Sequence, residues 1–221
     1  MTVLLVLSTF IIFLVIDHFY SKRALRPVIE PILAAELPHR PQPNIVSGFL
    51  LPDTLRYHPG HTWAQSEGPK LVRTGMDDFA ARLIGKVEKI TLPQRGQWVR
   101  QGQKICTVQR KGVAADIVAP VEGVVTDINE AAVADPELTR KDPYGEGWLV
   151  AIESPDAKLN FRNLLSGDLA RWWMEEAGAR LRKYVPMAAG AMADGGVAVY
   201  DLSGEMSDEQ WTKVAKEFFL G

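Results

Sequence analysis

The stretch "DIVAPVEGVVTDIN", residues 116–129, holds two short apolar runs separated by a proline and a glycine. Runs of this kind, bounded by turn residues, are typical of short β-strands. Similar runs precede it in the chain, namely "KLVRTG", "KVEKITL" and "KICTVQ", and glycines at 85, 96, 102, 112 and 123 punctuate the series. The chain from residue 57 to about residue 155 is therefore predicted to form a β core.

One helix is expected to interrupt these strands, in "MDDFAARLIG" at residues 76–85. Helical spacing places Phe79, Leu83 and Ile84 on one face, and Gly85 is a favourable residue for a helix C-terminus. Together with helices expected after the strands, this pattern predicts an α+β fold with a β-rich core.

The composition is that of a globular chain: of 221 residues, 47% are hydrophobic and 24% are charged. The formal net charge is −2 and no basic stripe is interleaved with aromatic residues, so nucleic acid is not expected as a partner. The single cysteine, Cys106, excludes an internal disulfide and cannot form a thiolate metal site alone. We expect it to be a buried strand thiol.

Residues 1–20 predict a single transmembrane helix, because residues 2–16 carry no charge and 20 residues cross a bilayer core. Lys22, Arg23 and Arg26 follow this span, so the positive-inside rule predicts an inner-membrane protein with its N-terminus outside and its C-terminal domain in the cytoplasm. A cleaved secretory signal is the alternative, but the sequence lacks a basic region before the apolar run and a small-residue cleavage site after it.

Residues 21–55 are predicted to be a proline-rich tether, with six prolines between Pro27 and Pro52. Proline breaks helices and favours extended geometry, so this segment is expected to be semi-rigid. Its apolar part, "PVIEPILAAELP", is as suited to packing on a neighbour as to solvent.

Four stretches together carry a family resemblance. These are "HTW" at 61–63, "TGMDDFAARLIG" at 74–85, "DIVAPVEGVVTDIN" at 116–129 and "DPELTRKDPYGEGWL" at 135–149. In this order and spacing, residues 56–182 resemble the H protein of the glycine cleavage system. The resemblance implies a lipoyl-carrier domain of the barrel-sandwich hybrid type.

In that family a lipoylated lysine stands four residues before the aspartate of the Asp-Ile-x-Ala-Pro strand, and an acidic residue precedes the lysine by three. Here that position is Gly112, its neighbour is Lys111, and Gln109 and Arg110 stand where the acidic residue is expected. A one-residue shift in a hairpin changes where a side chain points, and glycine there also suits a turn with positive φ. Lys111 is therefore interpreted as an unmodified surface lysine, with a lipoyl attachment site as the alternative.

No other pattern predicts a catalytic or metal site. The four histidines show no metal-binding helical spacing, and no phosphate-binding loop or nucleophile elbow is present. The polar cluster "PYGEGW" at 143–148 is interpreted as a structural turn. We accordingly expect no catalytic residue, no metal and no cofactor, apart from the alternative of lipoate on Lys111.

Two helices are expected after the strands. The first, in "NLLSGDLARWWMEEAGARLRKYV", resembles the family's C-terminal helix. It is predicted to pack on the β-rich core through an apolar side that comprises Leu164, Leu165, Leu169, Trp172, Trp173 and Leu181. The second is an amphipathic helix in the C-terminal extension, residues 183–221, where Ser207 and Gln210 form a capping box. Either this helix docks on its own domain, or it binds a partner through Trp211, Phe218 and Phe219.

These features favour a membrane-anchored, non-enzymatic accessory subunit that docks on an integral membrane protein complex, of respiratory or photosynthetic type. A tethered protein suits a fixed partner better than a freely diffusing one. The alternative is a membrane-tethered lipoyl carrier that uses Lys111.

Overall fold

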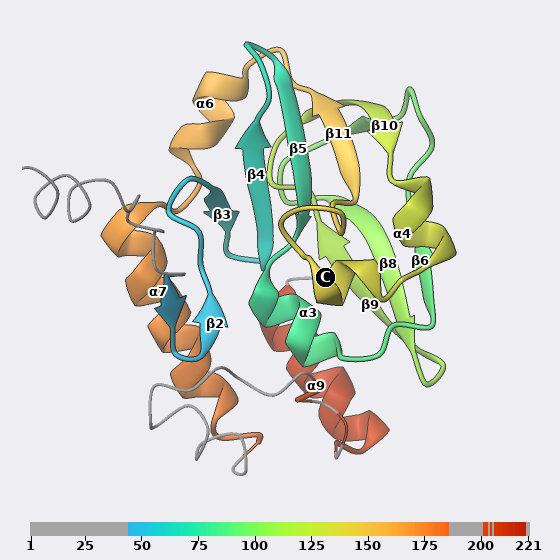
Figure 1. Ribbon diagram of the computed structural model, residues 1–221, viewed down its shortest axis with the longest axis vertical. Coiled ribbons are helices and arrows are strands. Elements are labelled where there is room, and N and C mark those ends of the chain that lie inside the picture. The colour runs from blue at the N-terminus through green and yellow to red at the C-terminus, as the bar shows by residue number, and fades with distance from the viewer. Residues whose placement is uncertain (1–43, 186–200, 203, 205, 220–221) are drawn as a thin grey trace, which may run out of the picture. The chain divides into compact units, whose positions relative to one another are not determined.

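The computed structural model describes residues 44–185, 201–202, 204 and 206–219 (Figure 1). The predicted transmembrane helix at residues 1–20 and the first part of the predicted tether lie outside these residues. Among the helices that the structure describes, none is long and apolar enough to cross a membrane.

Two antiparallel sheets form the centre of the domain. The larger sheet has the strand order β3-β4-β5-β11-β10-β7, and the smaller has the order β6-β8-β9. The strands are β3 (Arg56–His58), β4 (Thr62–Ser66), β5 (Leu71–Met76), β6 (Lys89–Thr91), β7 (Trp98–Val99), β8 (Lys104–Arg110), β9 (Val113–Val118), β10 (Gly123–Ile128) and β11 (Val150–Glu153). Both sheets bury apolar side chains in one core, so the predicted β-rich α+β fold is confirmed.

The predicted interrupting helix is α3 (Asp78–Ile84). The Asp77 side chain caps it by accepting a hydrogen bond from the Ala80 amide, and Gly85 ends it at φ 69°. Phe79, Leu83 and Ile84 are all fully buried, as their spacing predicts. Three short helices were not expected, α4 (Glu130–Ala134), α5 (Leu138–Lys141) and α6 (Ala157–Arg162), because segments this short lack a clear apolar period.

The tether boundary predicted at residue 55 needs correction. Residues before it form a small hairpin of β1 (Ile45–Val46) and β2 (Phe49–Leu50), and Phe49 and Leu51 are buried in the domain core. The prolines of this region predict an extended tether, but its last apolar residues, Phe49 and Leu51, are part of the core. The domain therefore begins before residue 56.

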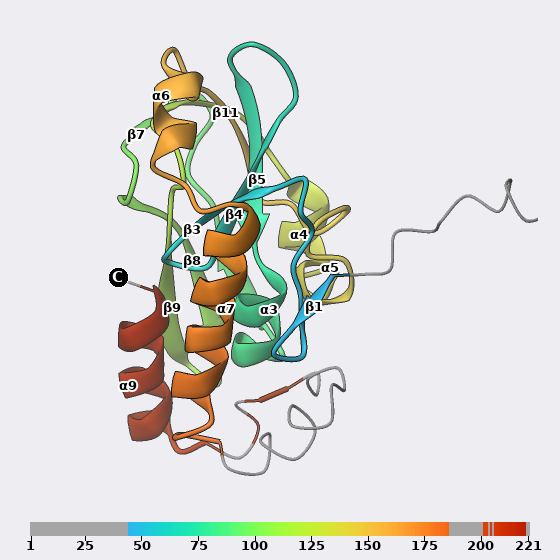
Figure 2. The ribbon, with the colours of Figure 1, turned by 90° about the vertical axis from the view of Figure 1, so that its left-hand side faces the viewer.

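After the strands come α6 (Ala157–Arg162) and α7 (Gly167–Leu181), which lie on the same side of the molecule in Figures 1 and 2. Trp173 and Leu181 of α7 are buried as predicted, whereas Leu169 is 56% exposed and Trp172 is 61% exposed. The prediction that these last two residues pack on the sheets is wrong. The small residues Ala170, Ala177 and Gly178 take part in the buried face instead, because they let α7 approach the β1–β2 hairpin closely.

The C-terminal extension contributes α9 (Asp208–Phe219), which packs along β9 (Figure 2). The predicted capping box is confirmed: the Gln210 amide donates to Ser207 Oγ at 3.3 Å, and the Ser207 amide donates to Gln210 Oε1 at 3.1 Å. Its apolar side is buried, with Trp211, Val214 and Phe218 each at most 1% exposed. The helix therefore docks on its own domain.

Candidate functional site

The β8–β9 hairpin ends in a two-residue turn made of Lys111 and Gly112. Arg110 and Val113 are the last cross-strand pair, and the turn residues have φ values of 47° and 76°. Positive φ at both central residues is the geometry that matches the twist of a β-hairpin. The positive φ expected for Gly112 is confirmed, and both turn residues are exposed.

Lys111 is a lysine in a backbone conformation that favours glycine. Left-handed geometry costs an ordinary L-residue roughly 1–2 kcal/mol. Its side chain is exposed and forms no ion pair with any residue in the part of the chain that the structure describes. The resemblance implies an attachment point at Gly112; the structure places Lys111 beside it, at the first of the two turn positions.

The base of this tip is held by the C-terminal helix. Arg110 is only 3% exposed, and its guanidinium lies over the Trp211 ring of α9, 5.5 Å from the ring centroid. Such a cation–π contact is strongest where water is excluded. Sequence reasoning missed this contact, because nothing in the pattern links two residues a hundred positions apart.

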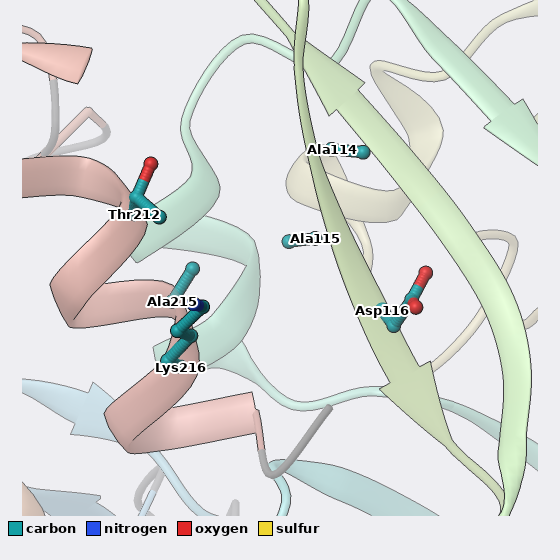
Figure 3. A pocket seen from close by; sticks show the side chains of 6 residues that line it. All are labelled: Ala114, Ala115, Asp116, Thr212, Ala215 and Lys216. Carbon is teal, nitrogen blue, oxygen red and sulfur yellow. The ribbon is translucent and has the colours of Figure 1, made fainter. Parts of the chain in front are cut away.

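A groove of about 210 Å³ separates α9 from β9 (Figure 3). Thr212, Ala215 and Lys216 line it from the helix, opposite residues 114–116 of the strand. Asp116 is already engaged within the hairpin, because it accepts a hydrogen bond from Thr107 Oγ1 at 2.8 Å and pairs with Lys104 Nζ at 3.1 Å. This aspartate, the reference point of the family resemblance, thus fixes the register of the hairpin.

A buried histidine lies where α3, α7 and α9 converge. His61 Nδ1 lies 2.9 Å from Asp77 Oδ2, and its ring stacks on Phe79 with a centroid distance of 4.0 Å. Phe218 and Phe219 approach the same ring edge-on from α9. His61 and Asp77 both lie in stretches that carry the resemblance, so a signal for this pair existed in the sequence although it was not interpreted as one.

The predicted structural turn "PYGEGW" is tied into the domain from several sides. The Asp142 carboxylate accepts the amides of Gly145 and Glu146, and Asn129 Nδ2 donates to the carbonyls of Glu146 and Trp148. Tyr144 Oη donates to the Leu50 carbonyl at 2.6 Å, and burial raises the pKa of this phenol well above its ordinary value. These bonds support the structural interpretation of the turn.

The other sequence-predicted residues do not gather at the hairpin tip. Phe218 and Phe219 lie in the core, and Trp211 lies beneath Arg110, so none of the three is on the surface. Cys106 is buried as expected, and burial raises the pKa of its thiol. Within the described ranges, no three His, Cys, Asp or Glu side chains gather in a way that could hold a metal ion.

Comparisons with known proteins agree with the resemblance. A glycine cleavage H-protein family model matches residues 55–177. The glycine cleavage system H protein of Alteromonas mediterranea is 37% identical over 107 residues, which cover 48% of this chain and 83% of that protein. A probable glycine cleavage system H protein of Aeropyrum pernix is 37% identical over 118 residues, which cover 53% and 81%.

A crystal structure of a glycine cleavage system H protein from Mycobacterium marinum aligns with 58% of this chain and 99% of that chain, at 26% identity and a TM-score of 0.48. The family model ends before α9 and begins after the β1–β2 hairpin, so both elements lie outside the matched region. Over residues 55–177, this chain belongs to the glycine cleavage H-protein family.

Proposed function

We propose that this chain is a membrane-anchored, non-enzymatic accessory subunit that keeps the H-protein domain as a docking module for an integral membrane protein complex. It acts from the cytoplasmic side of the inner membrane, held by residues 1–20, and carries no lipoate. The observation that carries the proposal is the hairpin tip, where Gly112 stands at the position that the family resemblance assigns to the modified lysine.

Two features of the tip support this reading. The neighbouring residues are Gln109 and Arg110 rather than an acidic residue, and Arg110 is buried against the Trp211 ring instead of being exposed to a modifying enzyme. A modifying enzyme that recognises a folded tip must meet both the lysine and the surface around it. In this chain α9 occupies part of that surface.

A second candidate is a membrane-tethered lipoyl carrier that uses Lys111. The specific observation in its favour is that Lys111 stands at the exposed tip of the hairpin. The relatives named above are glycine cleavage system H proteins, which makes the glycine cleavage reaction the natural setting for this alternative.

Intact-mass measurement of the full chain from its native host separates the two candidates. The docking proposal expects an unmodified chain, whereas a chain heavier by one lipoyl group at Lys111 would establish the carrier. Lys111→Ala should leave complex assembly and activity unchanged, with Lys89→Ala as a matched exposed control on β6. If the Lys111→Ala protein is stable but the host complex loses its activity, the docking proposal is refuted.

An exchange variant tests the position of the lysine directly. Lys111→Gly combined with Gly112→Lys moves the lysine by one residue and keeps the turn composition the same. If the offset prevents modification, a lipoate ligase should modify the exchanged protein and not the original. Equal modification of both proteins would remove the main support for an unmodified tip.

Membrane attachment and partner choice need their own measurements. A reporter fused after Gly221 should be active in the cytoplasm, because the basic cluster follows the predicted span. Periplasmic activity would overturn the orientation. Purification of the full chain in mild detergent should bring a membrane complex with it, whose subunits mass spectrometry can name.

A further inference from the structure

Helix α7 exposes two large apolar residues on the side that faces away from the core. Leu169 is 56% exposed and Trp172 is 61% exposed, and residues three positions apart lie on the same face of a helix. The opposite side of α7 is buried, where Trp173 packs against the rings of Tyr57 and His61. Figure 2 shows the helix on the outside of the domain. Leu169 and Trp172 are therefore open to solvent.

Three acidic side chains surround this tryptophan on the same face. Asp168 stands four positions before Trp172, and Glu175 and Glu176 stand three and four positions after it, the spacings that make helical residues neighbours. All three are exposed, and none forms an ion pair with any residue that the structure describes. We name the two apolar and three acidic residues together the outward face of α7.

The positive charges of α7, in contrast, are already paired. Arg171 pairs with Asp53 at 3.2 Å, and Arg180 lies 3.9 Å from Glu217. Two further cations come more than a helical turn after Glu176, namely Arg182 and Lys183. The outward face of α7 thus carries unpaired negative charge around its apolar residues. Exposed apolar residues that are grouped and rimmed by polar ones mark a binding surface.

The charge of this face argues against two common occupants. The cytoplasmic leaflet of a membrane carries anionic lipid, which repels unpaired carboxylates. Two copies of the chain that met symmetrically through α7 would bring identical acidic residues together, because a twofold interface uses the same patch on both subunits. The face instead fits a partner that is both basic and partly apolar.

We propose that the outward face of α7 docks on a basic cytoplasmic segment of the membrane complex. Leu169 and Trp172 contact apolar side chains of that segment, and the three carboxylates bind its lysine and arginine side chains. Cytoplasmic loops of membrane proteins are rich in lysine and arginine, so the cytoplasmic location in the proposed function supplies such a segment. Tryptophan contributes strongly to protein interfaces, and its ring also binds cations. The inference rests on the proposed function and names the surface that contacts the partner.

A photoreactive side chain on the full chain in native membranes tests the inference. Benzoylphenylalanine replaces Ala179, which is exposed seven positions after Trp172 and therefore lies beside the outward face without belonging to it. The control protein carries benzoylphenylalanine in place of Trp98, which is 48% exposed on β7. Isolated membranes are irradiated, and mass spectrometry identifies the crosslinked peptide.

We expect position 179 to crosslink to a segment of an integral membrane protein in which lysine and arginine outnumber aspartate and glutamate. Position 98 should not crosslink to that segment. Replacing Leu169 and Trp172 by serine should reduce the yield at position 179 several-fold, because the apolar contact is lost. Both residues are exposed, so urea unfolding should show that the serine variant keeps its stability.

Charge variants test the acidic part of the face. Glu175→Gln combined with Glu176→Gln should reduce the yield at position 179 several-fold. Glu88→Gln combined with Glu153→Gln changes the net charge equally at two exposed residues outside α7 and should leave the yield unchanged. Higher salt should reduce the yield from the original chain more than the yield from the Glu175 and Glu176 variant. Glu176→Lys should abolish the crosslink, and glutamate in place of the contacted cation of the partner should restore it.

Other outcomes overturn the proposal and show which part of it fails. If a membrane complex purifies with the chain but position 179 crosslinks no more than position 98, the docking function stands and the α7 surface is refuted. A crosslink to lipid, to a second copy, to another segment of the same chain or to an acidic segment assigns the outward face to that occupant instead. If no membrane complex purifies with the chain, the proposed function and this inference fail together.

Discussion

Helices α7 and α9 carry similar apolar patterns but use them differently. Both contain tryptophan at helical spacing with other large apolar residues, yet α9 buries Trp211 and Phe218 whereas α7 leaves Leu169 and Trp172 in solvent. The two helices are joined at their ends, where Glu217 of α9 accepts a hydrogen bond from Tyr184 and lies 3.9 Å from Arg180. The apolar pattern of a helix therefore does not determine which of its residues are buried; the elements that pack against the helix decide this.

The largest expected effect on stability comes from a substitution on the buried face of α9. Phe218→Ala should lower the free energy of unfolding by about 3–5 kcal/mol, because its ring packs on Phe79 with a centroid distance of 5.0 Å and the cavity cannot collapse easily. Trp172→Ala is the matched change on α7 and should alter the free energy by no more than about 0.5 kcal/mol. Urea unfolding of both variants in mild detergent measures the difference; equal losses would mean that α9 is not part of the core.

This contrast also defines what the sequence could predict. The strands, α3 and the capping box of α9 follow from local patterns, because apolar period and capping residues act within a few positions. Whether an apolar helix face is buried or exposed depends on elements that lie far away in the chain. Leu169 is therefore exposed although its helical spacing predicts a buried side, and Phe49 is buried although it lies in a proline-rich segment.

Some features of the candidate site could likewise be predicted from the sequence, and others could not. The turn with positive φ at Gly112 was predictable, because a short hairpin demands that geometry. The support of the tip by Trp211 was not predictable, since it requires α9 to cross β9. A fragment limited to residues 56–182 would lose both this helix and the β1–β2 hairpin, and with them part of the core.

The next effect concerns the tip that α9 supports. Gly112→Val should destabilise the domain by about 1–2 kcal/mol, because a β-branched residue is strained at a φ of 76°. A Cβ there meets no other atom within 4 Å, so the backbone conformation alone causes the loss. Lys111→Gly is the control and should be neutral or slightly stabilising in urea unfolding. A fully stable Gly112→Val protein would show that the turn can change its conformation.

A smaller effect is expected where α9 begins. Ser207→Ala should cost about 1 kcal/mol, because it removes the side-chain oxygen that accepts the Gln210 amide. Ser166→Ala, just before α7, is a matched control, since the Ser166 side chain makes no capping hydrogen bond. Urea unfolding should distinguish the two serines. Equal losses would indicate that the capping box does not stabilise α9.

The smallest effect is a dependence on pH near the other end of α9, where the Phe219 carbonyl lies close to Gly60. Burial, and then the charge of His61, lower the pKa of His58, whose Nδ1 accepts the Gly60 amide at 3.1 Å. As the pH falls below about 6.5, the unfolded chain binds a proton at His58 before the folded chain does, so the free energy of unfolding decreases. His58→Asn keeps an acceptor without a titrating ring and should flatten this decrease. Urea unfolding between neutral and mildly acidic pH measures the slope, and an unchanged slope in His58→Asn would assign the pH dependence to another group.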